Sequence, residues 1–328
     1  MARDVKAFVS LLLSVGLLLI SCGRSFTEDR DSIIWTAQTS LEKKDCAGAL
    51  AALQGIDLPL DASFLQTKAA AYACLAGFDI PTFFEEEVPK LSAMTGFNGT
   101  TLFASSQMTD SDDEDYLNLQ TAIDILLYAG DLPRDENPTP ASREALFTAA
   151  KIGDMHGMLV YFLLANLGKY FAYYGNTDAS GTKGLGSGSN SCLFNYDSSI
   201  SVTGDWSSLS LSLPSTITLG QLFSAGITGA CTGTNGLNLS VAQMCQGVVL
   251  VNNFMEIFSA IITSLGTDDW DKIKILKNAI SSIRGIITSP DMTEVENMLS
   301  QEKCEATFAG DNTALQVYFA IYLETLLQ

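Results

Sequence analysis

The sequence is poor in basic residues and has a single histidine. Its 328 residues include 18 Lys and Arg against 37 Asp and Glu, and the formal net charge is −19 at pH 7. A chain this acidic is repelled by nucleic-acid phosphates and by anionic lipid surfaces, both of which are bound by clusters of Lys and Arg. The composition therefore predicts no nucleic-acid partner and favours cationic partners or none.

Motifs of the common enzyme classes are missing as well. The sequence contains no GxSxG nucleophile motif, no GxxxxGK[ST] phosphate loop, and no GxGxxG that opens a helix after a strand. It has no CxxC pair, and one histidine is too few for the usual zinc ligand sets. We therefore predict no catalytic residues, no metal site and no cofactor, and we do not expect an enzyme.

An apolar run follows two basic residues near the N-terminus. Arg3 and Lys6 precede residues 7–20, whose length suits a signal-peptide core and is short of the roughly 20 residues that span a bilayer. The run ends in Leu19-Ile20-Ser21-Cys22, which resembles the bacterial lipobox. The resemblance implies that residues 1–21 are a removed signal peptide and that Cys22 carries a lipid. The alternative is an ordinary signal peptide with a chance cysteine.

The residues after Cys22 bear on the location of the protein. If the usual sorting pattern of bacterial lipoproteins applies, Gly23 and Arg24 imply the outer membrane, with the protein on its periplasmic or surface face. Loss of residues 1–21 removes two positive charges and one negative charge, so the net charge falls from −19 to −20. Because we expect no basic patch and no second apolar run of 18 residues, the lipid is predicted to be the membrane anchor.

Six cysteines remain when Cys22 is set aside. An even number in an exported chain predicts three disulfides, although six cysteines allow 15 pairings. We expect Cys245 to pair with Cys304, and Cys46 to meet Cys74 if their helices are antiparallel. The candidates are Cys46, Cys74, Cys192, Cys231, Cys245 and Cys304.

Behind the predicted signal peptide, the chain divides by composition into four segments. Residues 22–34 read as a lipidated tether and the start of a first helix, and residues 35–174 as an N-terminal helical array. Residues 175–238 are rich in Gly, Ser, Thr and Asn and predict a long loop or a short β arm, pinned by Cys192 and Cys231. Residues 239–328 return to helical periodicity.

Capping residues and apolar spacing predict individual helices. Asp45, Asp61, Asp113 and Pro81 are expected to start helices in the array. Further helices are predicted at about 140–151, 154–174, 241–265, 268–287, 290–308 and 313–327. Alternation of Leu209, Leu211 and Leu213 predicts a short strand or extended arm within the loop.

Two stretches of the array resemble each other. Lys44-Asp45-Cys46-Ala47-Gly48-Ala49-Leu50 is followed by a similar Ala-rich segment that ends in Gly77-Phe78-Asp79. The step of 33 residues from Lys44 to Gly77, with Gly-Asp breaks at residues 130–131 and 153–154, resembles the tetratricopeptide repeat. This resemblance implies an all-α fold of stacked antiparallel helical hairpins. Generic helical hairpins are the alternative.

Three polar features of the sequence could in principle take part in catalysis or metal binding. His156 could act as a base, but its neighbours Met155, Met158 and Leu159 indicate a packed position. The acidic run 110–115 could bind calcium, but it lacks the Gly and Glu of an EF-hand loop and suits a helix N-terminus. Glu85–Glu87 fan around a helix and indicate a solvated surface.

The most aromatic helix is the best candidate site in the sequence. Its side chains could line a groove for a peptide or lipid tail, although such residues are more often core. They are Tyr161, Phe162, Tyr170, Phe171, Tyr173 and Tyr174. The expected function is a membrane-anchored scaffold or assembly factor with a protein partner in the cell envelope. The alternative is a periplasmic lipoprotein that binds a small or lipidic molecule, with an association to a transporter.

Overall fold

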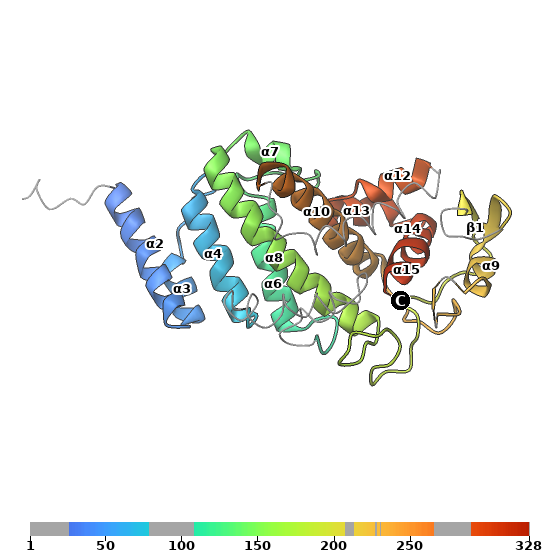
Figure 1. Cartoon of the computed structure of the whole chain (residues 1–328). Coiled ribbons are helices and arrows are strands. Elements are labelled where there is room, and N and C mark those ends of the chain that lie inside the picture. Colours follow the sequence, from blue (N-terminus) through green and yellow to red (C-terminus); the bar gives the residue numbers. More distant parts are fainter. Residues whose placement is uncertain are drawn as a thin grey trace, which may run out of the picture. The chain divides into compact units, whose positions relative to one another are not determined.

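A computed structural model of the chain describes residues 26–78, 108–206, 213–226, 228–229, 231–265 and 290–327. It is mostly helical, with 58% helix and 4% strand, and this confirms the α-helical class (Figure 1). The predicted signal peptide with Cys22, the helix predicted at Pro81 with Glu85–Glu87, and the helix predicted at 268–287 lie outside the described residues. The chain forms two compact units, Met1–Ile56 and Asp57–Gln328.

The described part of the first unit contains two helices that pack against each other, α2 (Phe26–Glu42) and α3 (Cys46–Leu53). Lys44 turns the chain between them with a positive φ of 58°. Asp45 caps α3 as predicted, because its carboxylate accepts a hydrogen bond of 2.9 Å from the Gly48 N–H. The short turn and the cap together fix where the second helix begins.

The second unit is built on four long helices that pack in series. These are α4 (Ala62–Leu75), α6 (Glu114–Leu127), α8 (Ala149–Tyr174) and α10 (Val241–Leu265), and Figure 1 shows each beside the next. Asp61 and Asp113 cap α4 and α6 as predicted, each by accepting a backbone N–H three residues on at 3.1 Å. Ala-rich α4 buries its small side chains, so its neighbours can approach closely.

The prediction of helices at 140–151 and 154–174 is wrong at their junction. The short helix α7 (Pro140–Glu144) ends early, and α8 begins at Ala149 and runs through Gly153 without a break. Ile152 and Met155 are buried on the same side of α8, so packing continues across the glycine. One exposed glycine costs only about 1 kcal/mol in a helix, which this burial outweighs.

Helix α10 corrects the expectation that no second long apolar segment follows the leader. Among the described residues, Val241–Ile261 is the one helix long and apolar enough to cross a membrane. However, 78% of its apolar window is buried inside the fold. We therefore describe α10 as the central core helix of the second unit.

The C-terminal region is more broken than its sequence pattern indicated. Instead of one helix from 290 to 308 there are two, α12 (Pro290–Glu296) and α13 (Gln301–Phe308). The Asn252 side-chain amide of α10 donates hydrogen bonds to the Val295 and Met298 carbonyls, at 2.7 and 3.0 Å. Ser300 then caps α13. A buried amide from another helix thus satisfies the carbonyls that the break exposes.

The last predicted helix, 313–327, is continuous but changes its winding. It runs as α14 (Thr313–Tyr318), a π-helical turn η6 (Phe319–Leu323) and α15 (Glu324–Leu326). The wider π turn inserts one residue into the repeat, and such turns occur frequently at functional sites. Glu324 follows it directly and is fully buried.

The described residues of the segment 175–238 form an excursion from the helices with little regular structure. Strands β1 (Ser201–Thr203) and β2 (Thr216–Thr218) form an antiparallel pair, and α9 (Leu219–Ser224) follows. Of the predicted strand, Leu209 and Leu211 lie outside the described residues, and Leu213 is not in a strand. A short β ribbon therefore lies on either side of these leucines, whereas the strand predicted at the leucines themselves is not found at Leu213.

The six cysteines among the described residues form disulfides. Cys245–Cys304 joins α10 to α13, which is the pair expected from the sequence, and Cys192–Cys231 pins the 175–238 segment. Cys46 and Cys74 are disulfide-bonded too. The bonded cysteines thus tie the excursion and the C-terminal helices into the described fold.

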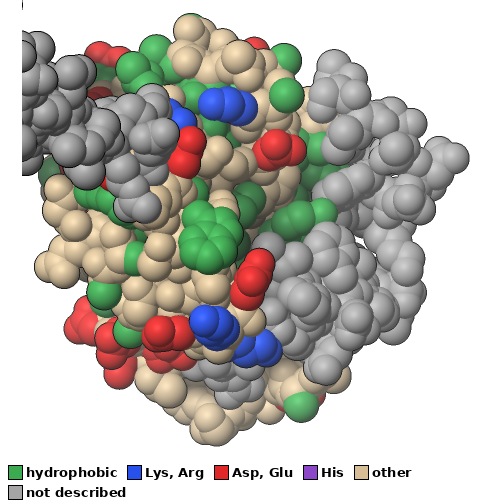
Figure 2. Space-filling view, turned by 90° about the vertical axis from the view of Figure 1, so that its left-hand side faces the viewer, with side chains coloured by type: hydrophobic (Ala, Val, Ile, Leu, Met, Phe, Trp, Pro, Cys, Tyr) green, Lys and Arg blue, Asp and Glu red, His purple; other side chains and the backbone are tan. Residues whose placement is uncertain are grey.

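Large hydrophobic side chains at the surface are few and scattered. Over the coloured part of the face in Figure 2, green side chains lie apart from one another among polar and acidic ones. Trp35, Leu60 and Leu185 are each more than 60% exposed, but they belong to different segments of the chain. Apolar residues exposed singly are normal in folded proteins, so these three do not define a docking face.

Candidate functional site

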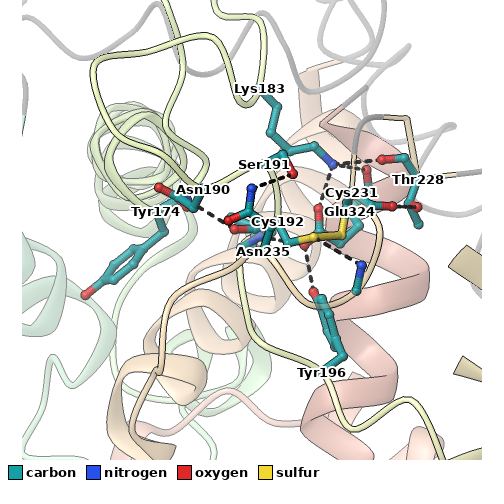
Figure 3. Close-up of polar contacts among 12 residues, drawn as sticks. Tyr174, Lys183, Asn190, Ser191, Cys192, Tyr196, Thr228, Cys231, Asn235 and Glu324 are labelled. Atoms are coloured by element: carbon teal, nitrogen blue, oxygen red, sulfur yellow. Dashed lines mark hydrogen bonds and ion pairs between the residues drawn. A yellow bond between two sulfur atoms is a disulfide. The ribbon is translucent and has the colours of Figure 1, made fainter. Parts of the chain in front are cut away.

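A buried ion pair lies at the base of the 175–238 segment. The Lys183 ammonium is 2.6 Å from a Glu324 carboxylate oxygen, and the two side chains are 3% and 0% exposed (Figure 3). Lys183 comes from the excursion and Glu324 from α15, so the pair joins parts of the chain that are 141 residues apart. Burying both charges is costly unless each is fully hydrogen-bonded.

The remaining hydrogen bonds of the pair meet this condition. The second Glu324 oxygen accepts from the Leu193 N–H at 2.6 Å and from the Tyr196 hydroxyl at 2.8 Å. The Lys183 ammonium also donates to the Thr228 and Glu324 carbonyls, at 3.1 and 3.2 Å. Burial, followed by the nearby Glu324 charge, raises the pKa of Tyr196 well above its ordinary value, so this hydroxyl stays a hydrogen-bond donor.

The same centre brings potential metal ligands together. The sulfurs of Cys192 and Cys231 and a carboxylate oxygen of Glu324 lie within 4.8 Å of one another. The two cysteines form a disulfide, and a disulfide offers no thiolate to a metal ion. Glu324 is already paired with Lys183. The donor set therefore suits a structural staple and does not fit a metal ion.

Further hydrogen bonds connect the 175–238 segment to α14 and fix its first residues. The Gln316 side chain of α14 accepts the Asp197 N–H at 2.9 Å, four residues before β1 begins. Asn176 and Asn190 fix the start of the excursion through hydrogen bonds to backbone groups. These bonds hold β1 beside α14, which gives the excursion a defined shape.

A groove of about 400 Å³ lies between β1 and the helices α12, α13 and α14. Its volume is in the range of sites that take small molecules or short peptide segments. The lining residues are Ser201, Val202, Thr203, Met292, Glu294, Thr307, Phe308, Asp311, Thr313, Ala314 and Val317.

The groove combines an apolar floor with an acidic rim. Val202, Met292, Phe308 and Val317 are all less than 7% exposed. Exposed Glu294 and Asp311 also line the groove, whereas none of the described residues of its lining is a Lys or Arg. Hydrogen bonds from Thr313 hold the pKa of the Asp311 carboxyl below its ordinary value, so the rim is negative at neutral pH.

One wall of the groove is a strand edge that has no pairing partner among the described residues. Across the ribbon, the Leu219 N–H donates to the Ile200 carbonyl and the Gly204 N–H donates to the Ser215 carbonyl. The backbone N–H and C=O groups of even-numbered residues in this stretch therefore point toward β2. Backbone groups alternate in direction along an antiparallel strand, so those of Ser201 and Thr203 point away from β2. No described residue outside the ribbon forms a hydrogen bond with these groups. Within the described part of the chain, β1 therefore presents donors and acceptors with no partner where it lines the groove.

The aromatic residues predicted as a groove are not brought together on one surface. Phe162, Tyr170, Phe171 and Tyr174 are buried in the second unit, where Tyr170 and Tyr174 pack at 4.5 Å between ring centroids. Tyr161 and Tyr173 are partly exposed. Of the six, Tyr173 alone lines a described cavity, one of about 260 Å³ at the C-terminal end of α8. The helix serves mainly as core.

His156 is a packed residue, next to a buried arginine. Its Nε2 accepts a hydrogen bond from Arg143 Nε at 3.3 Å, and Arg143 also donates to the Leu127 and Pro138 carbonyls. Burial, and then the Arg143 charge, lowers the pKa of His156 to about 4, and burial lowers that of Arg143 to about 10. The partner of His156 is thus a cation, which keeps the imidazole neutral and does not prepare it as a catalytic base.

The acidic run 110–115 caps α6. Asp113 accepts the N–H groups of Tyr116 and Thr109, and Asp110 accepts the Asp112 N–H at 2.8 Å. These bonds use carboxylate oxygens that a calcium ion would require. The arrangement matches the helix N-terminus that the sequence suggested.

The sequence reasoning missed both the groove and the ion pair. Lys183 is the only Lys or Arg between residues 175 and 238, and Glu324 is the only charged residue between 313 and 328. A lone charge in neutral or apolar surroundings is a signal for burial with a partner. No comparable signal marks Ser201 or Glu294. Comparisons of the chain with protein-family models, curated proteins and solved structures give no match.

Proposed function

We propose that this protein is a lipid-anchored scaffold of the bacterial cell envelope that holds a peptide segment of a partner protein in the β1–α14 groove. The observation that carries the proposal is the free edge of β1 beside an apolar floor. Main-chain hydrogen bonds at such an edge supply affinity for extended peptides, and adjacent pockets supply specificity.

Anchoring and orientation are part of the same proposal. The lipobox-like residues 19–22 support lipidation at Cys22 and attachment to a membrane, with the outer membrane favoured by Gly23 and Arg24. The serial helices of the second unit are compatible with a tetratricopeptide-like array, which we also propose. Helical arrays of this type commonly bind peptides.

The stapling of the excursion favours recognition over flexible linkage. A segment of some 60 residues held by a disulfide and a buried ion pair gives its strand edge a fixed position. A binding surface that is already ordered loses less conformational entropy on association. The ordering of β1 is therefore what a peptide-binding role requires.

A cross-linked pull-down of the lipidated protein from its own membranes tests this function. The groove variant is Ala314→Trp, which adds a large side chain to the groove lining, and its matched control is Ala150→Trp at an exposed position of α8. We expect one envelope protein to be recovered with the wild type and with A150W, and lost with A314W. Cys22→Ala separates the contribution of the anchor.

Each alternative result has a defined meaning. Recovery of the same partner with A314W would place the binding surface elsewhere on the scaffold. Recovery of the protein alone in every sample would reject the scaffold function.

A second function is favoured by the groove volume. A site of about 400 Å³ with an apolar floor also suits a small or lipidic molecule carried in the periplasm. Native mass spectrometry of protein released gently from membranes would then show a bound mass that A314W lacks. A bare polypeptide mass in both samples would reject this alternative.

A further inference from the structure

We infer that the groove binds an extended segment in which apolar and cationic side chains alternate, added to β1 as a third strand. The inference rests on the proposed peptide-binding function and specifies the chemistry of the partner. It follows from three features of the groove, which are the direction of its backbone groups, the position of its apolar floor and the sign of its charge.

The backbone of β1 defines the conformation of the occupant. Ser201 and Thr203 each offer one N–H and one C=O on the edge that faces away from β2. An added strand can therefore form up to four main-chain hydrogen bonds over three residues. Only an extended backbone matches this spacing, so a helical or compact ligand cannot use the edge.

The floor of the groove requires apolar side chains at alternate positions. Val202 is buried whereas Ser201 and Thr203 are exposed, so one face of β1 belongs to the core. Side chains of an added strand point alternately to the two faces. Those on the Val202 side meet Met292 and Phe308, and those between them reach the rim and the solvent.

The rim selects the charge of the occupant. Glu294 and Asp311 are exposed carboxylates, and the described lining of the groove holds no Lys or Arg. Lys and Arg have long side chains that reach such carboxylates while their apolar stems lie along the groove. A segment with cations between its apolar residues therefore complements the site.

The same charges exclude a second copy of this chain as the occupant. Pairing of β1 with β1 of another copy would bring two Glu294 and two Asp311 carboxylates to one site. Each chain also carries a formal charge of −19. Charged residues beside an open edge are a common device against edge-to-edge pairing of identical chains. The occupant is thus a different, cationic chain.

The test uses the full mature chain and labelled six-residue peptides in which Lys or Arg alternates with Val, Leu or Phe. Fluorescence anisotropy at low salt measures their affinity. Peptides of the same composition with the cations in one block, and peptides with Glu in place of Lys, are the ligand controls. We expect the alternating cationic peptides to bind at least tenfold more tightly than either control.

Backbone methylation of the best peptide tests strand addition directly. Methyl groups on every second amide block the hydrogen bonds of one peptide edge and leave the other edge free. One methylation register should abolish binding and the other should retain it. Equal effects of the two registers would overturn the proposal, because a ligand held by side chains alone has no such register.

Protein variants test the rim with a matched charge control. Glu294→Gln with Asp311→Asn should weaken binding about threefold to tenfold and reduce its dependence on salt. Asp135→Asn with Glu136→Gln makes the same change in net charge at exposed positions outside the groove lining, and should have little effect. Equal effects of the two double variants would overturn the role of the rim.

The outcomes separate this inference from the proposed function. If A314W loses the partner in the pull-down but no alternating cationic peptide binds, the scaffold function stands and the inference fails. If the pull-down recovers the protein alone in every sample and no alternating cationic peptide binds, both the scaffold function and the inference fail. Concentration-dependent dimers that A314W abolishes, seen by sedimentation, would assign the groove to a second copy and overturn the inference.

Discussion

Replacing Lys183 by methionine removes one half of the ion pair and leaves the Glu324 carboxylate buried without its cation. Loss of one partner from a buried pair generally costs about 3–5 kcal/mol of unfolding free energy. Glu324→Gln should cost a similar amount, because it leaves the Lys183 ammonium uncompensated at 3% exposure. Each single variant is therefore expected to be severely destabilised.

The double variant is expected to be milder than the two single variants suggest. With both charges gone, the glutamine carbonyl still accepts the Leu193 N–H and the Tyr196 hydroxyl, and methionine fills the space of the lysine stem. A residual cost of about 3 kcal/mol or less follows from imperfect hydrogen bonding. The coupling energy between the two positions should then be at least about 3 kcal/mol.

Guanidinium unfolding with disulfides intact, followed by circular dichroism, gives the four free energies of this double-mutant cycle. Hydrogen exchange of the peptide that contains Leu193 locates the effect, since its amide donates to Glu324. Additive single-variant costs below about 1 kcal/mol would refute the claim that the pair staples the excursion. Faster hydrogen exchange in the first unit, with no change in exchange of the peptide that contains Leu193, would refute this claim as well.

Three further predictions concern other parts of the fold. Folding lowers the pKa of His156 from about 6.5 to about 4, so on acidification the unfolded chain binds the proton before the folded chain does. The free energy of unfolding is therefore at its full value above pH 6.5 and falls by up to about 3 kcal/mol toward pH 4. The H156Q variant should flatten this part of a curve of stability against pH. The Cys245–Cys304 disulfide closes a loop of 59 residues, so the C245A/C304A double variant should lose about 4 kcal/mol of unfolding free energy in the chain-entropy model. Thermal unfolding measures this loss. An unchanged unfolding temperature of the wild type after addition of reductant would contradict the prediction. Asp113→Ala removes the cap of α6 and should cost about 1 kcal/mol in chemical denaturation, with Asp113→Asn nearly neutral.

Local signals explain which parts of the fold could be predicted from the sequence. The starts of α3, α4 and α6 depend on Asp45, Asp61 and Asp113, whose carboxylates bond N–H groups three residues away, so each cap can be read within one turn. The break between α12 and α13 depends instead on Asn252, 43 to 46 residues earlier, and local periodicity carries no sign of it. Tertiary contacts decided that boundary.

The candidate site lay beyond sequence reasoning for the same reason. The groove joins residues near 202 with residues between 292 and 317, and neither stretch shows a motif by itself. Aromatic density drew attention to α8, but a buried helix accumulates aromatic residues for packing alone. The free edge of β1 is a property of strand pairing, and the order of amino acids does not record which edge stays unpaired.

The long reach of the staple has a consequence for folding kinetics. The bonds from Glu324 to Lys183, Leu193 and Tyr196 span 128 to 141 residues, so they close large loops and form after the local helices. Until they form, β1 has no groove beside it. Recovery of peptide binding should therefore follow the slowest refolding phase, later than the return of helical circular dichroism.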